Sequence, residues 1–345
     1  MKLGVNLTYQ GASELAVAAE RFGYDVAFAP EGYRSDAASV LGMVAGRTDR
    51  IGLASGVMQI PARPPGLAAL TAATLNSLSA GRFRLGLGVS NPDVSDGWYG
   101  VPFDRPLERT REYVEIVRMA LSGEPVVYAG EHYQLPSSGS AGGAPLHVIT
   151  EPAGALVPVY LGAVGPRNLQ LAGEIADGWI GVFAAPEQVA ESVERIAAGR
   201  ALRGSTMAGF EVIPCLATSV GESVEGCVDL LRAHYAHLMG IGDPARNFYC
   251  KLAARLGWPQ DAQEVSLRVR AGDRAGAAAA VPTDFVDQTS LVGPVDRIAE
   301  RMAAYAEAGV TTLSIMISAV ATDLTGRLAI LEQAMAALEK SGAGS

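Results

Sequence analysis

Residues 75–88, LNSLSAGRFRLGLG, hold the end of a helix, a turn and the start of a strand. Ser79-Ala80-Gly81 is typical of a turn that ends a helix, so we predict a helix over Pro65–Leu78. The β-rich run that follows predicts a strand over Phe83–Val89. A helix joined to a strand by a short turn is one unit of an alternating α/β chain.

The same alternation extends from this segment in both directions. We predict further helices at Ala12–Phe22 and Ala37–Arg47, and further strands at Leu3–Leu7, Val26–Ala29, Ile51–Val57, Val159–Ala163, Trp179–Val182, Val212–Thr218 and Leu313–Ile317. About eight strands separated by helices predict the α/β fold class, as a single (β/α)8 TIM-barrel domain over residues 1–345. Two longer stretches, approximately 91–156 and 238–291, interrupt the alternation and are interpreted as insertions in one barrel.

The composition narrows the class of protein. Lys and Arg number 27 against 36 Asp and Glu, a net charge of −9, which argues against nucleic acid or a membrane as a partner. With 49% hydrophobic and 18% charged residues, the chain is predicted to fold around large buried surfaces. The N-terminal residues resemble a strand more than a signal peptide, so we predict a cytoplasmic protein. The cysteines form no C-x-x-C pair, and no metal site is predicted.

In a parallel barrel the reacting groups lie in the loops after the strands. Here those loops carry mostly neutral hydrogen-bonding groups: Asn6 and Thr8, Glu31 and Tyr33, Gln59, Ser90 and Asn91, and Gly165-Pro166-Arg167-Asn168. The sequence contains neither G-x-S-x-G nor H-E-x-x-H, which argues against triad hydrolysis and metalloprotease chemistry. His234 and His237 face one side of a predicted helix and are interpreted as a surface pair. We therefore expect an organic cofactor to supply the reactivity.

Two segments are candidates for holding such a cofactor. In Ala163-Val164-Gly165-Pro166-Arg167 a strand runs through a Gly-Pro turn into a helix, whose N-terminal amides favour a phosphate. An ordinary strand-to-helix turn with a solvated Arg167 is the equal alternative. Gly56 inside an apolar strand indicates a bulge or a close approach of the backbone to a ligand. Gly86 and Gly88 in another strand leave space beside a flat ring, although glycine used only for interior packing explains them as well.

These segments together resemble the luciferase-like monooxygenase superfamily of flavin and deazaflavin oxidoreductases. The resemblance is carried by Ala54-Ser55-Gly56-Val57, by residues 75–88, by 161–167 with 172–179, and by 292–299 with 308–310. Residues 97–103 and 109–113 look most like the actinobacterial branch that uses coenzyme F420. The resemblance implies a bacterial-luciferase-like barrel with F420 as cofactor, its reduced form being the hydride donor.

The resemblance also implies roles for single residues. Gly56-Val57 matches the position of a non-prolyl cis peptide that lies behind the central ring of the bound cofactor. Ser55 beside it and Gly88 on the neighbouring strand are further expected cofactor contacts. Ala163, Val164, Gly165, Pro166 and Arg167 match a phosphate-binding turn; Ser90, Asn91 and Asn6 are the other cofactor contacts. Related enzymes carry Asp or His at the end of strand two, where this chain has Glu31. Glu31 is accordingly the candidate for cofactor contact or proton delivery, or alternatively a carboxylate that only complements a helix dipole.

The implied reaction transfers a hydride from C5 of reduced F420 to an electron-poor C=C or C=N bond of a small molecule or a peptide. Glu31, Tyr33 and Trp98 are the candidate catalytic residues, as proton donors or walls. Trp98, Phe103 and the loop near Gly142 resemble a lid, with surface packing of Trp98 as the equal alternative. The alternative functions are an FMN-dependent monooxygenase and, less favoured, a nonenzymatic flavin-binding protein. Composition and resemblance together predict a homodimer.

Overall fold

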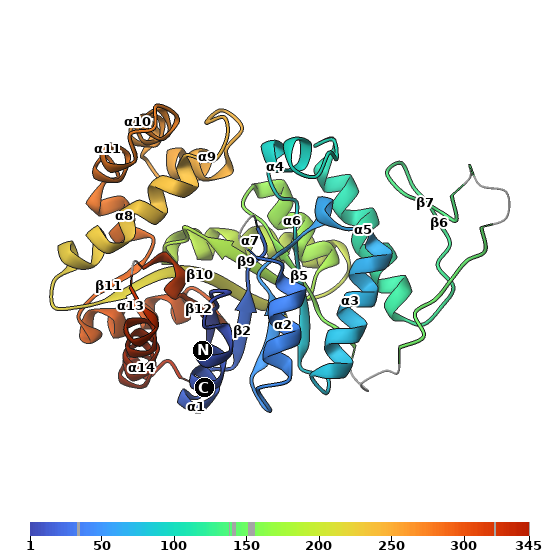
Figure 1. Cartoon of the computed structure of the whole chain (residues 1–345), viewed down its shortest axis with the longest axis horizontal. Coiled ribbons are helices and arrows are strands. Elements are labelled where there is room, and N and C mark those ends of the chain that lie inside the picture. Colours follow the sequence, from blue (N-terminus) through green and yellow to red (C-terminus); the bar gives the residue numbers. More distant parts are fainter. Residues whose placement is uncertain (33–34, 138, 140–142, 151–155, 321, 345) are drawn as a thin grey trace. The chain divides into compact units, whose positions relative to one another are not determined.

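The computed structural model describes residues 1–32, 35–137, 139, 143–150, 156–320 and 322–344. These residues form strands and helices that alternate along the chain (Figure 1). The chain divides into two compact units, the first made of Met1–Ala27, Ile180–Arg195 and Glu211–Ser345, and the second of Phe28–Trp179 and Ile196–Phe210. Both boundaries of the longest segment of the second unit fall inside strands, β2 (Val26–Ala29) and β9 (Gly178–Val182).

The first unit joins the two ends of the chain in one parallel sheet. Strand β1 pairs with β12, with Leu3 opposite Leu313, and β12 pairs with β10, with Ser314 opposite Cys215. Strand β11, which was not predicted, pairs with the end of β10. The elements of this unit are β1 (Lys2–Asn6), α1 (Ala12–Phe22), β10 (Glu211–Val220), α8 (Val224–Met239), α9 (Phe248–Arg255), α10 (Pro259–Arg270), α11 (Arg274–Ala279), α12 (Thr283–Gln288), β11 (Leu291–Gly293), α13 (Val295–Glu307), β12 (Thr312–Met316), a 3-10 turn (Ile317–Ala319) and α14 (Leu324–Ser341).

The second unit contains residues 75–88, in which helix α3 ends and strand β5 follows. Strand β5 lies between β3 and β8, with Leu53 opposite Phe83 and Leu85 opposite Val159, and all four of these side chains are buried. The elements of this unit are α2 (Ala37–Ala45), β3 (Gly52–Ser55), β4 (Met58–Gln59), a 3-10 turn (Ile60–Ala62), α3 (Pro65–Leu78), β5 (Phe83–Gly88), α4 (Pro92–Gly97), α5 (Pro106–Leu121), β6 (Tyr128–Ala129), β7 (Gln134–Leu135), β8 (Val159–Gly162) and α6 (Pro166–Ile175). Helix α7 (Pro186–Leu202) has residues in both units.

The strand order gives the fold class. The order β10-β12-β1-β2-β3-β5-β8-β9, together with the pairing of β10 and β9, forms a cycle of eight strands. The predicted (β/α)8 barrel is confirmed. The predicted strand over Ile51–Val57 is interrupted after Ser55 and resumes as β4, and the predicted helix over Ala37–Arg47 ends at Ala45. Among the described residues, no helix combines the length and the apolar character that crossing a membrane requires.

The stretches predicted as insertions hold short elements. Residues 91–156 contain α4, α5 and the antiparallel hairpin β6–β7, which was not predicted. Glu112 of α5 anchors this hairpin, because its carboxylate accepts hydrogen bonds from the backbone amides of Glu131, His132 and Tyr133 at 2.8, 2.9 and 3.1 Å. Residues 238–291 contain α9 to α12, which gather beside α8 (Figure 1).

Candidate active site

The break between β3 and β4 builds the floor of the candidate site. The peptide bond between Gly56 and Val57 is cis, so the predicted non-prolyl cis peptide is present. The Gly56 amide donates to the Ala29 carbonyl at the end of β2, at 2.9 Å. Ser55 is fully buried, and its hydroxyl donates to the Gly86 carbonyl at 2.8 Å and accepts from the Gly86 amide at 2.9 Å. The Ser55 side chain therefore ties β3 to β5.

The glycines beside the cis peptide make room for a side chain of the protein. A Cβ on Gly88 would lie 2.6 Å from Val57 Cγ2, and one on Gly162 would lie 3.4 Å from Val57 Cγ1. The close approach of Val57 to Gly88 agrees with the alternative of glycine used for interior packing, and a cofactor contact at Gly88 stays a prediction. Gly88 thus acts on the site by letting Val57 pack against β5, whereas a Cβ on Gly162 would make an ordinary contact with Val57.

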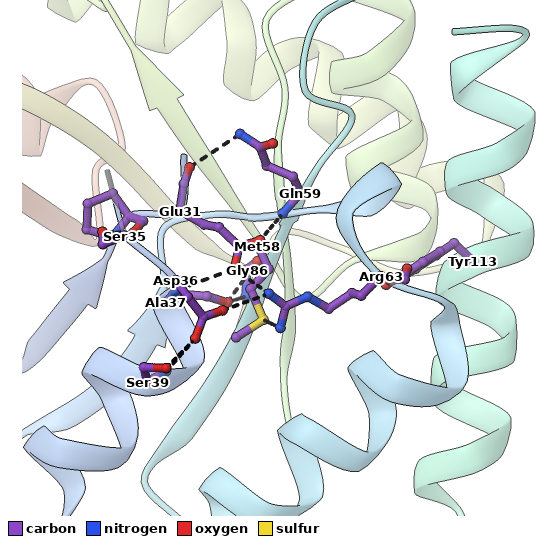
Figure 2. Close-up of polar contacts among 12 residues, drawn as sticks. Glu31, Ser35, Asp36, Ala37, Ser39, Met58, Gln59, Arg63, Gly86 and Tyr113 are labelled. Atoms are coloured by element: carbon purple, nitrogen blue, oxygen red, sulfur yellow. Dashed lines mark hydrogen bonds and ion pairs between the residues drawn. The ribbon is translucent and has the colours of Figure 1, made fainter. Parts of the chain in front are cut away.

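Glu31 follows β2 and is at the centre of a buried polar network (Figure 2). Its side chain is 4% exposed and forms an ion pair with Arg63, whose side chain is 10% exposed. Glu31 Oε1 accepts from the Gln59 amide at 3.0 Å, and Oε2 accepts from the Ala37 amide, the first residue of α2, at 3.4 Å. Both carboxylate oxygens are therefore engaged by the protein.

The remaining contacts of Arg63 extend this network. Arg63 Nη2 also lies 3.2 Å from Asp36 Oδ1, and Asp36 caps α2 by accepting from the Ser39 amide at 2.7 Å. The Tyr113 hydroxyl donates to the Arg63 carbonyl at 3.1 Å and so links α5 to the same segment. The network holds the end of β2, the start of α2 and β4 in one arrangement.

The environment of Glu31 acts on its pKa in two directions. Burial raises the pKa of the carboxyl above its ordinary value, while the Gln59 amide and the Arg63 guanidinium act to lower it, and the net direction is upward. The contacts make Glu31 a positioning residue, and they also agree with the alternative of a carboxylate at a helix N-terminus. Proton delivery by Glu31 stays a prediction.

Two buried polar atoms, Gln59 Oε1 shortly after the cis peptide and Ser90 Oγ shortly after β5, have no hydrogen-bond partner among the described residues. Ser90 follows β5 and has a φ of +63°, a conformation that is costly for a residue with a Cβ. The side-chain oxygen of Asn91 already has a partner in the protein, because it caps α4 by accepting a hydrogen bond from the Val94 amide at 3.0 Å. Since buried polar groups are normally paired, the two orphaned atoms mark places where a bound molecule is able to complete the bonding.

The predicted phosphate turn begins α6. Gly165 is the N-cap residue and offers no side-chain cap, and Pro166 lies in the first turn. Arg167 is exposed and has no hydrogen bond or ion pair with any described residue. The Ala163 carbonyl is occupied, because it accepts from Trp179 Nε1 at 2.8 Å. The turn thus combines a helix N-terminus that lacks a side-chain cap with an uncommitted guanidinium, as a phosphate seat requires.

The remaining predicted site residues that the structure describes lie outside the Glu31 network and the turn that begins α6. Trp98 is the C-cap residue that follows α4 and is 66% exposed, which agrees with the surface alternative. Phe103 lines a small pocket with Ile60 and Val89, the residues that follow β4 and β5. Asn6 ends β1 in the first unit and is 4% exposed. Tyr33 and Gly142 lie outside the described residues. Within the described part of the chain, no group of His, Cys, Asp and Glu side chains is arranged to hold a metal ion.

Sequence reasoning missed Arg63 and Gln59 as members of this network. Gln59 was recognised as a strand-end residue but was given no role, and Arg63 was not considered. The signal for Arg63 was available in principle, because a buried carboxylate requires a cation. Its position, 32 residues from Glu31, follows from the barrel and not from local spacing.

Comparison with known proteins gives the context of this geometry. The sequence model of the luciferase-like monooxygenases matches residues 3–312. The chain is 38% identical to a protein of Mycobacterium tuberculosis named as a coenzyme F420-dependent oxidoreductase, over 91% of this chain and 94% of that protein. It is 29% identical to 5,10-methylenetetrahydromethanopterin reductase of Archaeoglobus fulgidus, over 90% and 92% of the two chains. The structure of the coenzyme F420-dependent tetrahydromethanopterin reductase of Methanopyrus kandleri superimposes with a TM-score of 0.81 at 22% identity, covering 97% of each chain, which supports the fold.

Proposed function

The chain belongs to the luciferase-like monooxygenase family, and from this premise we propose that it is a coenzyme F420-dependent oxidoreductase. The observation that carries the proposal is the 38% identity, over 91% of this chain, to a relative named for dependence on F420. The uncommitted groups of the site support it. Ser90 Oγ and Gln59 Oε1 lack partners among the described residues, and the start of α6 with Arg167 is suited to the phosphate of such a cofactor.

The proposed reaction is the reduction of an electron-poor C=C or C=N bond in a small molecule or a peptide. When bound, reduced F420 would supply the hydride from C5 to one atom of that bond and be left as oxidised F420, and one of the candidate donors Glu31, Tyr33 and Trp98 would supply the proton to the other atom. The protein holds the reactants at short distance, which accounts for much of the rate enhancement in reactions of this kind. Val57 with Gly88 and Gly162 fixes the floor, and Glu31 with Arg63 keeps that floor attached to α2.

The experiment that tests the proposal is anaerobic turnover with F420 reduced at C5 with deuterium. We expect conversion of a panel of enones and imines, with deuterium recovered on carbon in the product and oxidised F420 formed in equal amount. Absence of turnover with reduced F420, together with oxygen-dependent turnover with reduced FMN, would contradict the proposal and favour the monooxygenase alternative. Retained binding of F420 without turnover of any acceptor would favour a binding protein.

A further inference from the structure

Gln59 is a polar residue of the Glu31 network with a buried hydrogen-bonding atom that lacks a partner among the described residues. Its backbone amide donates to Glu31 Oε1 at 3.0 Å, and its side-chain Nε2 donates to the Glu31 carbonyl at 3.3 Å. These two bonds to one residue fix the carboxamide in orientation. Because Nε2 donates to a carbonyl, the other end of the amide is the oxygen, an acceptor. That oxygen is buried and has no partner among the described residues.

The neighbouring donor groups do not serve this oxygen. Arg63 directs Nη2 to Glu31 and Asp36 and Nη1 to Met58 Sδ. Arg63 Nε is also without a partner, but Figure 2 shows the Gln59 carboxamide directed away from the Arg63 guanidinium. A buried acceptor without a donor destabilises the folded protein, so a donor from a bound molecule is the natural complement.

The position of Gln59 indicates which molecule supplies that donor. Gln59 is two residues beyond the cis peptide and lies opposite Gly88 in the pairing of β4 with β5. The Glu31 network therefore holds its side chain beside the floor on which the proposed function places the cofactor ring. The head groups of F420 and FMN share a pyrimidine ring with an N–H that is present in both redox states.

We propose that Gln59 is a cofactor-binding residue whose side-chain oxygen accepts a hydrogen bond from the pyrimidine N–H of the deazaflavin, with Glu31 as the residue that positions it. The inference rests on the proposed function for the identity of the cofactor. It adds to that function the residue that recognises the polar edge of the ring. Since the N–H is common to F420 and FMN, Gln59 contributes to the affinity for both and not to the choice between them.

The test is a fluorescence titration of the purified full-length apoprotein with F420 and, separately, with FMN. We expect Gln59→Met to weaken the binding of both by roughly five- to tenfold, the effect of one hydrogen bond, and to leave the ratio of the two affinities unchanged. The matched control is Gln170→Met, at an exposed position of α6, which we expect to bind both ligands as the wild type does.

A second measurement does not depend on the folding of the variant. F420 methylated at the pyrimidine N–H lacks the donor, so the wild type is expected to bind it at least fivefold more weakly than F420, and Gln59→Met to discriminate less between the two. Equal affinity of the wild type for F420 and its methylated form, or of wild type and Gln59→Met for F420, overturns the inference while the proposed function stands. A wild type that prefers FMN overturns the proposed function alone, and one that binds neither ligand overturns both.

Discussion

Replacement of Arg63 by methionine tests how strongly the buried ion pair between Glu31 and Arg63 stabilises the folded protein. Removing one partner of a buried ion pair typically costs about 3 to 5 kcal/mol, because the other charge stays buried without compensation. Here Glu31 is 4% exposed and keeps the amides of Gln59 and Ala37 as donors. We therefore expect Arg63→Met to lower the free energy of unfolding by about 3 kcal/mol, the lower end of that range.

Urea unfolding of the wild type, the two single variants and the double variant Glu31→Gln/Arg63→Met measures this effect. The double variant removes both charges, so it is expected to recover most of the loss. Arg111→Met, which breaks the half-exposed pair with Glu174, is the matched control and is expected to cost no more than about 1 kcal/mol. A loss below about 1 kcal/mol for Arg63→Met, or a double variant no more stable than Arg63→Met, would refute the reasoning.

The same variant predicts a dependence on pH. Burial raises the pKa of Glu31, and Arg63→Met removes the cation that opposes this rise. The folded variant then binds a proton more tightly than its unfolded chain, so its stability falls as pH rises through the folded pKa. We expect the deficit relative to the wild type to be smaller at pH 5 than at pH 8. An equal deficit at both values would show that the carboxylate is not the source of the cost.

The packing of the second unit leads to three further predictions. Gly88→Ala places a Cβ 2.6 Å from Val57 Cγ2 and is expected to lower the free energy of unfolding by about 1 to 3 kcal/mol, measured by thermal unfolding. Gly162→Ala places its Cβ 3.4 Å from Val57 Cγ1 and is expected to lower it by less. Equal losses for the two variants would contradict this packing. Glu112→Leu removes the acceptor of three backbone amides and is expected to lower the free energy of unfolding by about 2 kcal/mol. Hydrogen exchange of the backbone amides is expected to become faster over residues 128–135. Unchanged exchange there would show that Glu112 does not anchor the hairpin. Ser90→Gly relieves the cost of the positive φ and is expected to be about 1 kcal/mol more stable to unfolding than Ser90→Ala. Both variants are expected to bind F420 more weakly than the wild type. Equal stability of the two variants would show that the backbone conformation is not costly.

The barrel could be predicted because its evidence is local. Strand and helix runs, closed by turns such as Ser79-Ala80-Gly81, repeat along the chain and need no knowledge of distant contacts. The short elements were missed because they depend on such contacts. The hairpin β6–β7 relies on Glu112 of α5, and β11 is a three-residue strand that is defined by its pairing with β10.

The candidate site was predictable in residue type more than in arrangement. The cis peptide at Gly56–Val57 followed from a family resemblance, since nothing in the spacing of residues specifies it. Glu31 was found from its place after a strand, but its engagement with Arg63 depends on tertiary packing. The packing of Val57 against Gly88 could not be predicted, because it depends on how the chain folds after the cis peptide.

The measurement that tests the central claim most directly is the relative affinity of the apoprotein for reduced F420 and reduced FMN, determined by anaerobic fluorescence titration. An F420-dependent oxidoreductase is predicted to favour F420 by tenfold or more, which corresponds to about 1.4 kcal/mol. A preference for FMN, or binding of neither molecule, would contradict the account.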